Sequence, residues 1–169
     1  MWNDTDTPLA FLISFRCYGT WLHGDERGSI DRHNNVYGTP KYEHTAHWKE
    51  ISEQRLKYAP VKLNAVRRTC VEKAVRECCE RRGWNLHAVH VRTNHAHTVV
   101  ATGSRHPKIA LNGFKANATR VMRQNGCWPY DRTPWADKGS ERWLWTEKHV
   151  FDAVDYVLNG QGYDLPTFE

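Results

Sequence analysis

The first 22 residues contain an apolar run whose pattern predicts a buried strand. In "PLAFLISFRCYGTWL", residues 8–22, Phe11, Ile13 and Phe15 share one face while Leu12 lies on the other. A segment that is apolar on both faces is typical of a strand covered on both sides of its sheet. We therefore expect a central strand at the start of the chain.

Three later segments carry apolar residues at helical spacing. In residues 63–82 they recur every four residues, and Gly83 follows as a stop signal. Residues 107–125 begin with Pro107, and residues 147–159 are closed by Asn159 and Gly160. Each segment predicts an amphipathic helix.

The remaining periodic segments predict strands. Residues 84–93 and 95–103 are joined with almost no loop at Thr93 and Asn94, which predicts an antiparallel hairpin, and "RWLW" at 142–145 predicts a short strand. The resulting order is strand, loop, helix, strand, strand, helix, strand, helix. It predicts an α+β fold, a ferredoxin-like sandwich with helices on a mostly antiparallel sheet.

Length and composition predict one domain. The 169 residues show no break in composition, so we expect a single domain over 1–169 with a long polar loop insertion at about 24–60 and a short helix near 48–57. No apolar run approaches the roughly 18 residues of a membrane span, and acids stand where an export signal carries bases. We expect a cytoplasmic protein without a membrane partner, and its five cysteines as reduced core residues.

Positive charge is concentrated in the middle of the chain. Residues 61–130 hold 13 Lys and Arg against 3 Asp and Glu, which favours a polyanionic partner such as nucleic acid; a solvated basic face explains the same charge. The residues predicted to follow a DNA backbone are Arg92, Lys115, Arg120 and Arg123.

Two histidines stand at the start of the second hairpin strand. In "NHAHTVV", His95 and His97 are two residues apart, so on a strand they share one face. Two neutral imidazoles can hold a divalent cation and leave positions open for phosphate oxygens. Histidines on a solvated sheet face explain the pattern equally well.

The last helix offers a nucleophile and amide ligands. "FDAVDYVLNGQG" places Tyr156 near the helix end, followed by Asn159 and Gln161. A tyrosine at such a position is usually a packing residue. Here, an amide oxygen of Asn159 or Gln161 could complete a site of two histidines and one oxygen.

The order of these motifs resembles the single-tyrosine HUH transposases, relatives of insertion-sequence transposases and of REP-associated tyrosine transposases. The resemblance is carried by "RCYGTWLHGD", "NHAHTVV", "FKANATR" and "YVLNGQG" and spans nearly the whole chain. It implies an HUH endonuclease type of fold, with His95 and His97 as the metal-binding pair and Tyr156 as the attacking residue. Two departures stand out: Ala96 is small for the family, and Gly160 occupies the usual position of the amide ligand, so Gln161 is slightly favoured over Asn159.

The same resemblance implies an activity. The expected protein is a single-stranded DNA endonuclease and strand transferase that uses Mg²⁺ or Mn²⁺ and a 5′-phosphotyrosine intermediate, on single-stranded or hairpin DNA. With one tyrosine per chain, moving a DNA segment requires either a homodimer or sequential cleavages. Two other functions fit the residues: a regulator that binds nucleic acid without cutting it, and a metallonuclease in which water attacks.

Overall fold

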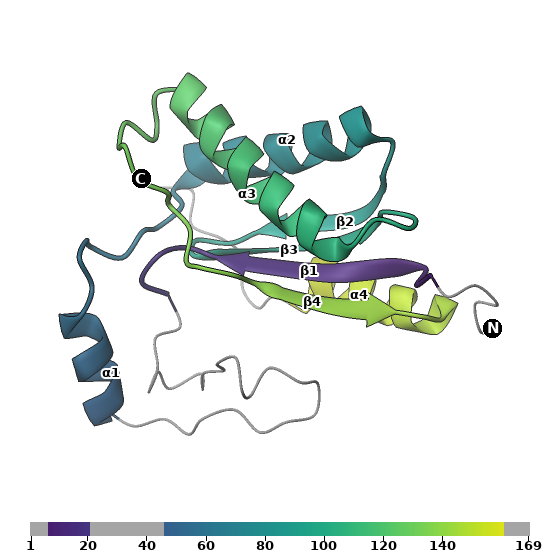
Figure 1. The fold of residues 1–169 in the computed structure, drawn as a ribbon, viewed down its shortest axis with the longest axis horizontal. Coiled ribbons are helices and arrows are strands. Elements are labelled where there is room, and N and C mark those ends of the chain that lie inside the picture. Colours follow the sequence, from purple (N-terminus) through teal and green to yellow (C-terminus); the bar gives the residue numbers. More distant parts are fainter. Residues whose placement is uncertain (1–6, 21–45, 161–169) are drawn as a thin grey trace. The chain divides into compact units, whose positions relative to one another are not determined.

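The computed structural model describes residues 7–20 and 46–160 (Figure 1). In chain order, these residues form β1 (Ala10–Arg16), α1 (Ala46–Gln54), α2 (Ala65–Arg82), β2 (Asn85–Val91), β3 (His95–Ala101), α3 (Pro107–Gln124), β4 (Ser140–Leu144) and α4 (Glu147–Asn159). The predicted helices and strands are confirmed, with ends that shift by a few residues. β4, for example, starts at Ser140 rather than at residue 142.

The four strands form one antiparallel sheet in the order β2-β3-β1-β4. This order, with α2 between β1 and β2 and α3 between β3 and β4, is that of a ferredoxin-like fold. Leu12 faces Val99 of β3 on one side and Arg142 of β4 on the other. The predicted fold class and the central position of the first strand are therefore confirmed.

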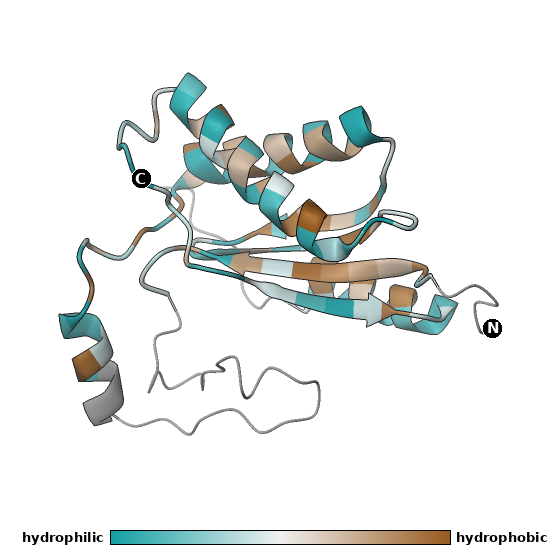
Figure 2. Cartoon of the chain, viewed as in Figure 1, coloured by the Kyte–Doolittle hydropathy of each residue, from teal (hydrophilic) through white to brown (hydrophobic). Residues whose placement is uncertain are grey.

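Helices cover both faces of the sheet. α2 and α3 pack on one face and against each other, whereas α4 packs on the opposite face (Figure 1). In Figure 2 the apolar positions gather on β1 and on the helix surfaces turned toward the sheet. The core under α4 contains Leu12, Val99, Leu144 and Val157, together with Ala10, Ala88 and Ala153.

The ends of the helices follow from local capping. The Asn64 side chain accepts a hydrogen bond from the Arg67 amide at 2.9 Å, and α2 stops where Gly83 adopts a φ of 67°. His106 caps α3 before Pro107, and the Thr146 side chain caps α4. Within the described residues, no helix is long and apolar enough to cross a bilayer.

By its internal contacts, the chain divides into two compact units, Met1–Cys17 with Lys62–Glu169 and Tyr18–Val61. In the second unit, the Tyr18 hydroxyl accepts from the Lys57 amide at 2.8 Å, and its carbonyl accepts from the Val61 amide at 2.9 Å. Residues 46–54 there form α1, close to the helix expected near 48–57. Most of the predicted 24–60 insertion lies outside the described residues, and the single domain over 1–169 stays a prediction.

The five cysteines lie in the core or at its margin. Four are buried, Cys127 is half-buried, and all five are free thiols. Burial raises the pKa of Cys17 and of Cys79 to about 12, so both thiols stay protonated and unreactive at neutral pH. They act as small apolar residues.

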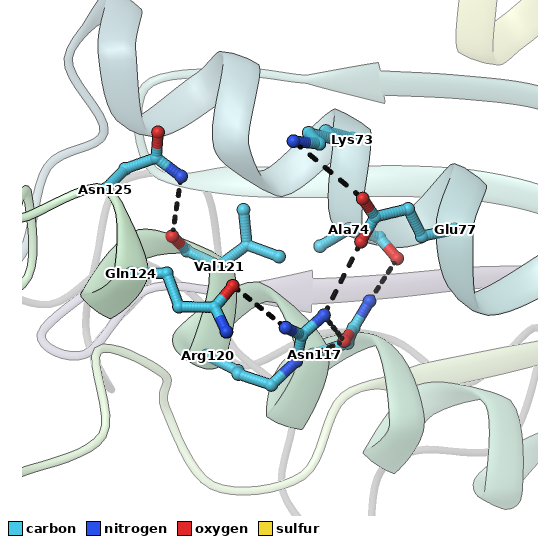
Figure 3. A network of polar contacts seen from close by, with 8 residues as sticks. All are labelled: Lys73, Ala74, Glu77, Asn117, Arg120, Val121, Gln124 and Asn125. Carbon is cyan, nitrogen blue, oxygen red and sulfur yellow. Dashed lines mark hydrogen bonds and ion pairs between the residues drawn. The ribbon is translucent and has the colours of Figure 1, made fainter.

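A buried asparagine joins α2 to α3 (Figure 3). Asn117 is 5% exposed; its amide nitrogen donates to the Ala74 carbonyl at 2.7 Å, and its oxygen accepts from Arg120. We expect Asn117→Ala to lower the free energy of unfolding by about 1 to 3 kcal/mol, because Arg120 loses a buried partner and the helices lose a hydrogen bond. Urea denaturation measures this. Asn112→Ala, at an exposed position of the same helix, is the control and should change stability by less than about 0.5 kcal/mol.

Candidate functional site

The alternation of β3 brings the two predicted histidines together. Val99 lies in the core beneath α4, so His97 and His95, two and four residues earlier, belong to the same face of the strand. The centroids of the two imidazole rings are 4.8 Å apart. His97 is 6% exposed and His95 is half-buried.

The predicted nucleophile lies against this pair. The Tyr156 ring meets the His97 ring edge to face, with centroids 5.5 Å apart and planes at 65°. Tyr156 is 47% exposed, whereas the next residue of α4, Val157, is fully buried. The two histidines and the tyrosine thus form one cluster within a single chain.

Hydrogen bonds hold both imidazoles from their Nδ1 side. His95 Nδ1 donates to the Asn94 side-chain oxygen at 2.7 Å, which leaves the lone pair of that ring on Nε2. His97 Nδ1 lies 2.5 Å from the Ser14 hydroxyl of β1. Partners of this kind orient a metal-ligating histidine and select the nitrogen that binds.

Burial keeps His97 neutral. Burial, with smaller contributions from the nearby His95 and His90, lowers the pKa of His97 to about 3. The imidazole is consequently uncharged at neutral pH, which is the form that binds a metal ion.

Sequence reasoning missed two residues of this site. His90 pairs with His97 across the hairpin, and its Nδ1 donates to the Val157 carbonyl at 3.0 Å, which ties β2 to the turn of α4 that carries Tyr156. The two-residue turn at Thr93 and Asn94 implies this pairing. Ser14 carried a weaker signal, a hydroxyl within an apolar run.

The donor set fits a divalent ion in part. Two imidazoles on one face are suitable ligands, but the described residues contain no group of three or more His, Cys, Asp or Glu that could hold a metal. The Asn159 amide nitrogen donates to Asp155 at 2.8 Å on the exposed side of α4, and Gln161 lies outside the described residues. The third ligand stays a prediction.

The structure does not bring the predicted DNA-binding residues of α3 to the tyrosine. α3 and α4 lie on opposite faces of the sheet (Figure 1). Lys115 Nζ donates to the carbonyls of Ala136, at 2.8 Å, and Lys138, and burial lowers its pKa. This ammonium clamps the connection that leads to β4.

The two arginines of α3 are also engaged. Arg120 bonds Asn117 and Gln124 and reaches Glu77 at 3.5 Å (Figure 3). Arg123 donates to the carbonyls of Tyr130 and Arg132. Of the four predicted residues, only Arg92 belongs to the turn region beside the histidines, where its amide donates to the His95 carbonyl at 2.8 Å. Their contact with DNA stays a prediction.

The lowered pKa of His97 predicts a pH dependence of stability. Between pH 6.5 and about 3 the unfolded chain binds a proton that the folded chain excludes, so stability falls as the pH is lowered through this window. At pH 5 this contribution costs about 2 kcal/mol. In EDTA, His97→Asn should show a correspondingly flatter decline of unfolding free energy from pH 7 to 5. The exposed His87→Asn is the control; a wild-type decline in His97→Asn would contradict the assignment.

Comparison with known proteins supports the fold. No family model and no curated protein sequence matches the chain. Among solved structures, it is similar to a REP-associated tyrosine transposase bound to a REP hairpin, with a TM-score of 0.50, 10% identity and coverage of 93% of this chain and 69% of the other. A transposase candidate from Deinococcus radiodurans R1 gives a TM-score of 0.43 at 12% identity, covering 96% and 97%. The chain therefore has the fold of the REP-associated tyrosine transposase.

Proposed function

We propose that the protein is a metal-dependent endonuclease and strand transferase for single-stranded DNA, with Tyr156 as its nucleophile. The observation that carries the proposal is the Tyr156 ring 5.5 Å from the ring of His97, beside His95. A tyrosine hydroxyl next to two imidazoles that could hold a metal ion combines a nucleophile with a site for a Lewis acid, and both can serve covalent phosphoryl transfer.

The reaction needs no nucleotide cofactor. Tyr156 Oη attacks a backbone phosphorus, the bond from oxygen to phosphorus forms, and the bond from phosphorus to the 3′-oxygen breaks. The tyrosine loses its proton, the 3′-oxygen leaves as a hydroxyl, and a 5′-phosphotyrosine remains. Because the phosphodiester bond energy is conserved, a later 3′-hydroxyl can reverse the step onto a new end.

The residues around Tyr156 have different proposed roles. His95 and His97 would hold Mg²⁺ or Mn²⁺, and the ion would offset negative charge on the phosphoryl oxygens. Ser14 and Asn94 orient the two imidazoles. His90 holds the backbone next to Tyr156.

The difference in exposure favours a large substrate. Tyr156 is 47% exposed, so a DNA strand can approach it from solvent, whereas His97 is shielded at 6%. The similar solved structure is bound to a REP hairpin, which makes a single strand containing a hairpin the first substrate to test.

A covalent adduct would test the nucleophile. Incubated with end-labelled hairpin-containing single-stranded DNA and Mg²⁺ or Mn²⁺, the protein should give a DNA-linked band on a denaturing gel. Tyr156→Phe should abolish the band, since it removes the attacking oxygen. Tyr130→Phe is the control, because Tyr130 is also 47% exposed and lies in the connection before β4; it should leave the band unchanged.

Two results would contradict this reaction. Cleavage that persists in Tyr156→Phe would assign the attack to water and make the protein a metallonuclease. Binding without cleavage in the native protein, with either metal, would assign it the role of a regulator.

Metal affinity would test the support of His97. Ser14→Ala keeps both imidazoles but removes the hydroxyl at His97 Nδ1, so Mn²⁺ affinity should fall by about tenfold or more. Isothermal titration calorimetry with Mn²⁺ measures this. The matched control is Ser140→Ala, an exposed serine of β4 that faces Ser14 in the sheet. Equal Mn²⁺ affinity in the native protein and in a His95→Asn, His97→Asn variant would place the ion elsewhere.

A further inference from the structure

A pocket of about 250 Å³ lies where α2 ends and α3 begins, away from the tyrosine. It is lined by Arg82, Trp84, Arg105 and Ile109, two cations and two apolar residues without an acid. The volume is just below the range of about 300 to 1,000 Å³ for small-molecule sites, so it suits one unit of a polymer better than a large cofactor.

The aromatic wall of the pocket is fixed by the core. The Trp84 ring packs edge to face on Phe114, with centroids 6.4 Å apart, and Phe114 is fully buried. The Arg82 guanidinium lies 5.0 Å from the centroid of the Trp84 ring. A guanidinium held on an aromatic ring is already ordered, so less conformational entropy is lost when it binds an anion.

The Arg82 side chain lies close to Gly113 of α3. A Cβ on Gly113 would stand 3.9 Å from Arg82 Nη2 and 3.4 Å from Cys78 Sγ. Arg82 therefore lies back against α3 as well as over Trp84. Two elements, rather than one flexible side chain, set the position of this cation.

The second cation starts from a fixed backbone. The Arg105 amide donates to the Thr102 carbonyl at 3.3 Å, and the Thr102 hydroxyl donates to the Arg105 carbonyl at 2.8 Å. Thr102 is 4% exposed, which anchors this turn in the protein. Arg82 and Arg105 are themselves exposed and Ile109 is 40% exposed, so a ligand can reach the pocket.

These features select a ligand with an anionic group and a flat apolar group. Arginine pairs bind phosphate with two hydrogen bonds each, and an aromatic and an aliphatic wall suit a nucleobase. Within a duplex each base is stacked on both faces and paired at its edge, so only an unpaired base can enter a pocket.

We propose that this pocket binds one unpaired nucleotide of a single-stranded DNA, with its phosphate between Arg82 and Arg105 and its base against Trp84 and Ile109. The choice of DNA rests on the proposed function. The pocket lies at the ends of β2 and β3 far from the hairpin turn. β3 is seven residues long, so about 20 Å separates the pocket from the start of β3, where His95 lies. It is thus a separate subsite for the strand.

Fluorescence anisotropy would test the pocket without cleavage. The probes are a labelled 12-nucleotide oligothymidine, the same backbone with abasic sites, and a duplex of equal length. All proteins carry Tyr156→Phe and are kept in EDTA, so chemistry and metal do not contribute. Thermal melting confirms that each variant is folded.

The test variant is Arg82→Gln with Arg105→Gln, and its control is Lys73→Gln with Arg76→Gln. The control pair removes the same charge from exposed positions of α2 where each cation pairs with a glutamate, Lys73 with Glu77 and Arg76 with Glu72. We expect the test variant to bind oligothymidine about tenfold more weakly, and its slope of log affinity against log salt to fall by about 0.7, as for the loss of one phosphate contact.

A separate variant tests the contact between the base and Ile109. Ile109→Ser should reduce binding of oligothymidine severalfold and leave binding of the abasic strand unchanged, since only the base meets Ile109. Three results would each overturn the proposal. The test and control variants could lose the same affinity for oligothymidine, or the native protein could bind oligothymidine and the abasic strand equally well. The test variant could also lose as much affinity for the duplex as for oligothymidine. Adduct formation is measured separately, with Mg²⁺ and in proteins that keep Tyr156. Normal adduct formation by the native protein, together with unaffected oligothymidine binding in the test variant, refutes the pocket alone. Weakened oligothymidine binding in the test variant, together with no adduct from the native protein, refutes the reaction alone.

Discussion

The strict alternation of β3 between two covered faces is the constraint on which the site depends. β3 pairs with β2 on one side and β1 on the other, and every residue from Ala96 to Val100 is buried. Val99 fills the core beneath α4, and this register carries His97 and His95 to the same face. A slip of one residue against β1 would send both imidazoles toward α2 and α3 and would part His97 from Ser14. The burial of Val99 therefore determines the face of β3 on which His95 and His97 lie.

The local patterns predicted the elements because each has a local cause. Helical spacing, Gly83 and Pro107 located the helices, and the short turn at Thr93 and Asn94 located the hairpin. Local sequence patterns could not predict which residues meet on each face of the sheet, because this depends on contacts between distant parts of the chain. The hydrogen bond between Ser14 and His97 joins residues 83 positions apart, and the ring contact between His97 of β3 and Tyr156 of α4 also joins segments that are distant in the sequence.

The basic residues illustrate the same limit. Charge counted along the sequence treats Lys115, Arg120 and Arg123 as one surface. In the fold, Lys115 donates hydrogen bonds to backbone carbonyls of the connection to β4. Arg120 bonds Asn117 between α2 and α3, and Arg123 bonds a carbonyl of the segment after α3. Net charge alone therefore does not indicate which of these cations are free to meet a ligand. Cations held by an aromatic ring, such as Arg82 on Trp84, cannot be recognised from charge alone, because the contact depends on where α2 ends relative to α3.

The rotation of α4 about its axis explains how one helix can both close a core and present the proposed nucleophile. Ala153 and Val157, one turn apart, are buried against the sheet, while Leu158 is 52% exposed. Successive residues of a helix are turned by about 100°, so a residue next to a buried one lies on the flank of the helix. Tyr156 occupies this flank, with one side against His97 and nearly half of its surface in solvent. The hydrogen bond from His90 to the Val157 carbonyl opposes rotation or sliding at this turn. A tyrosine at position 157 would enter the core in place of Val157, and one at position 158 would point into solvent as Leu158 does. The burial of Val157 therefore determines that position 156 is the one that lies beside the histidines.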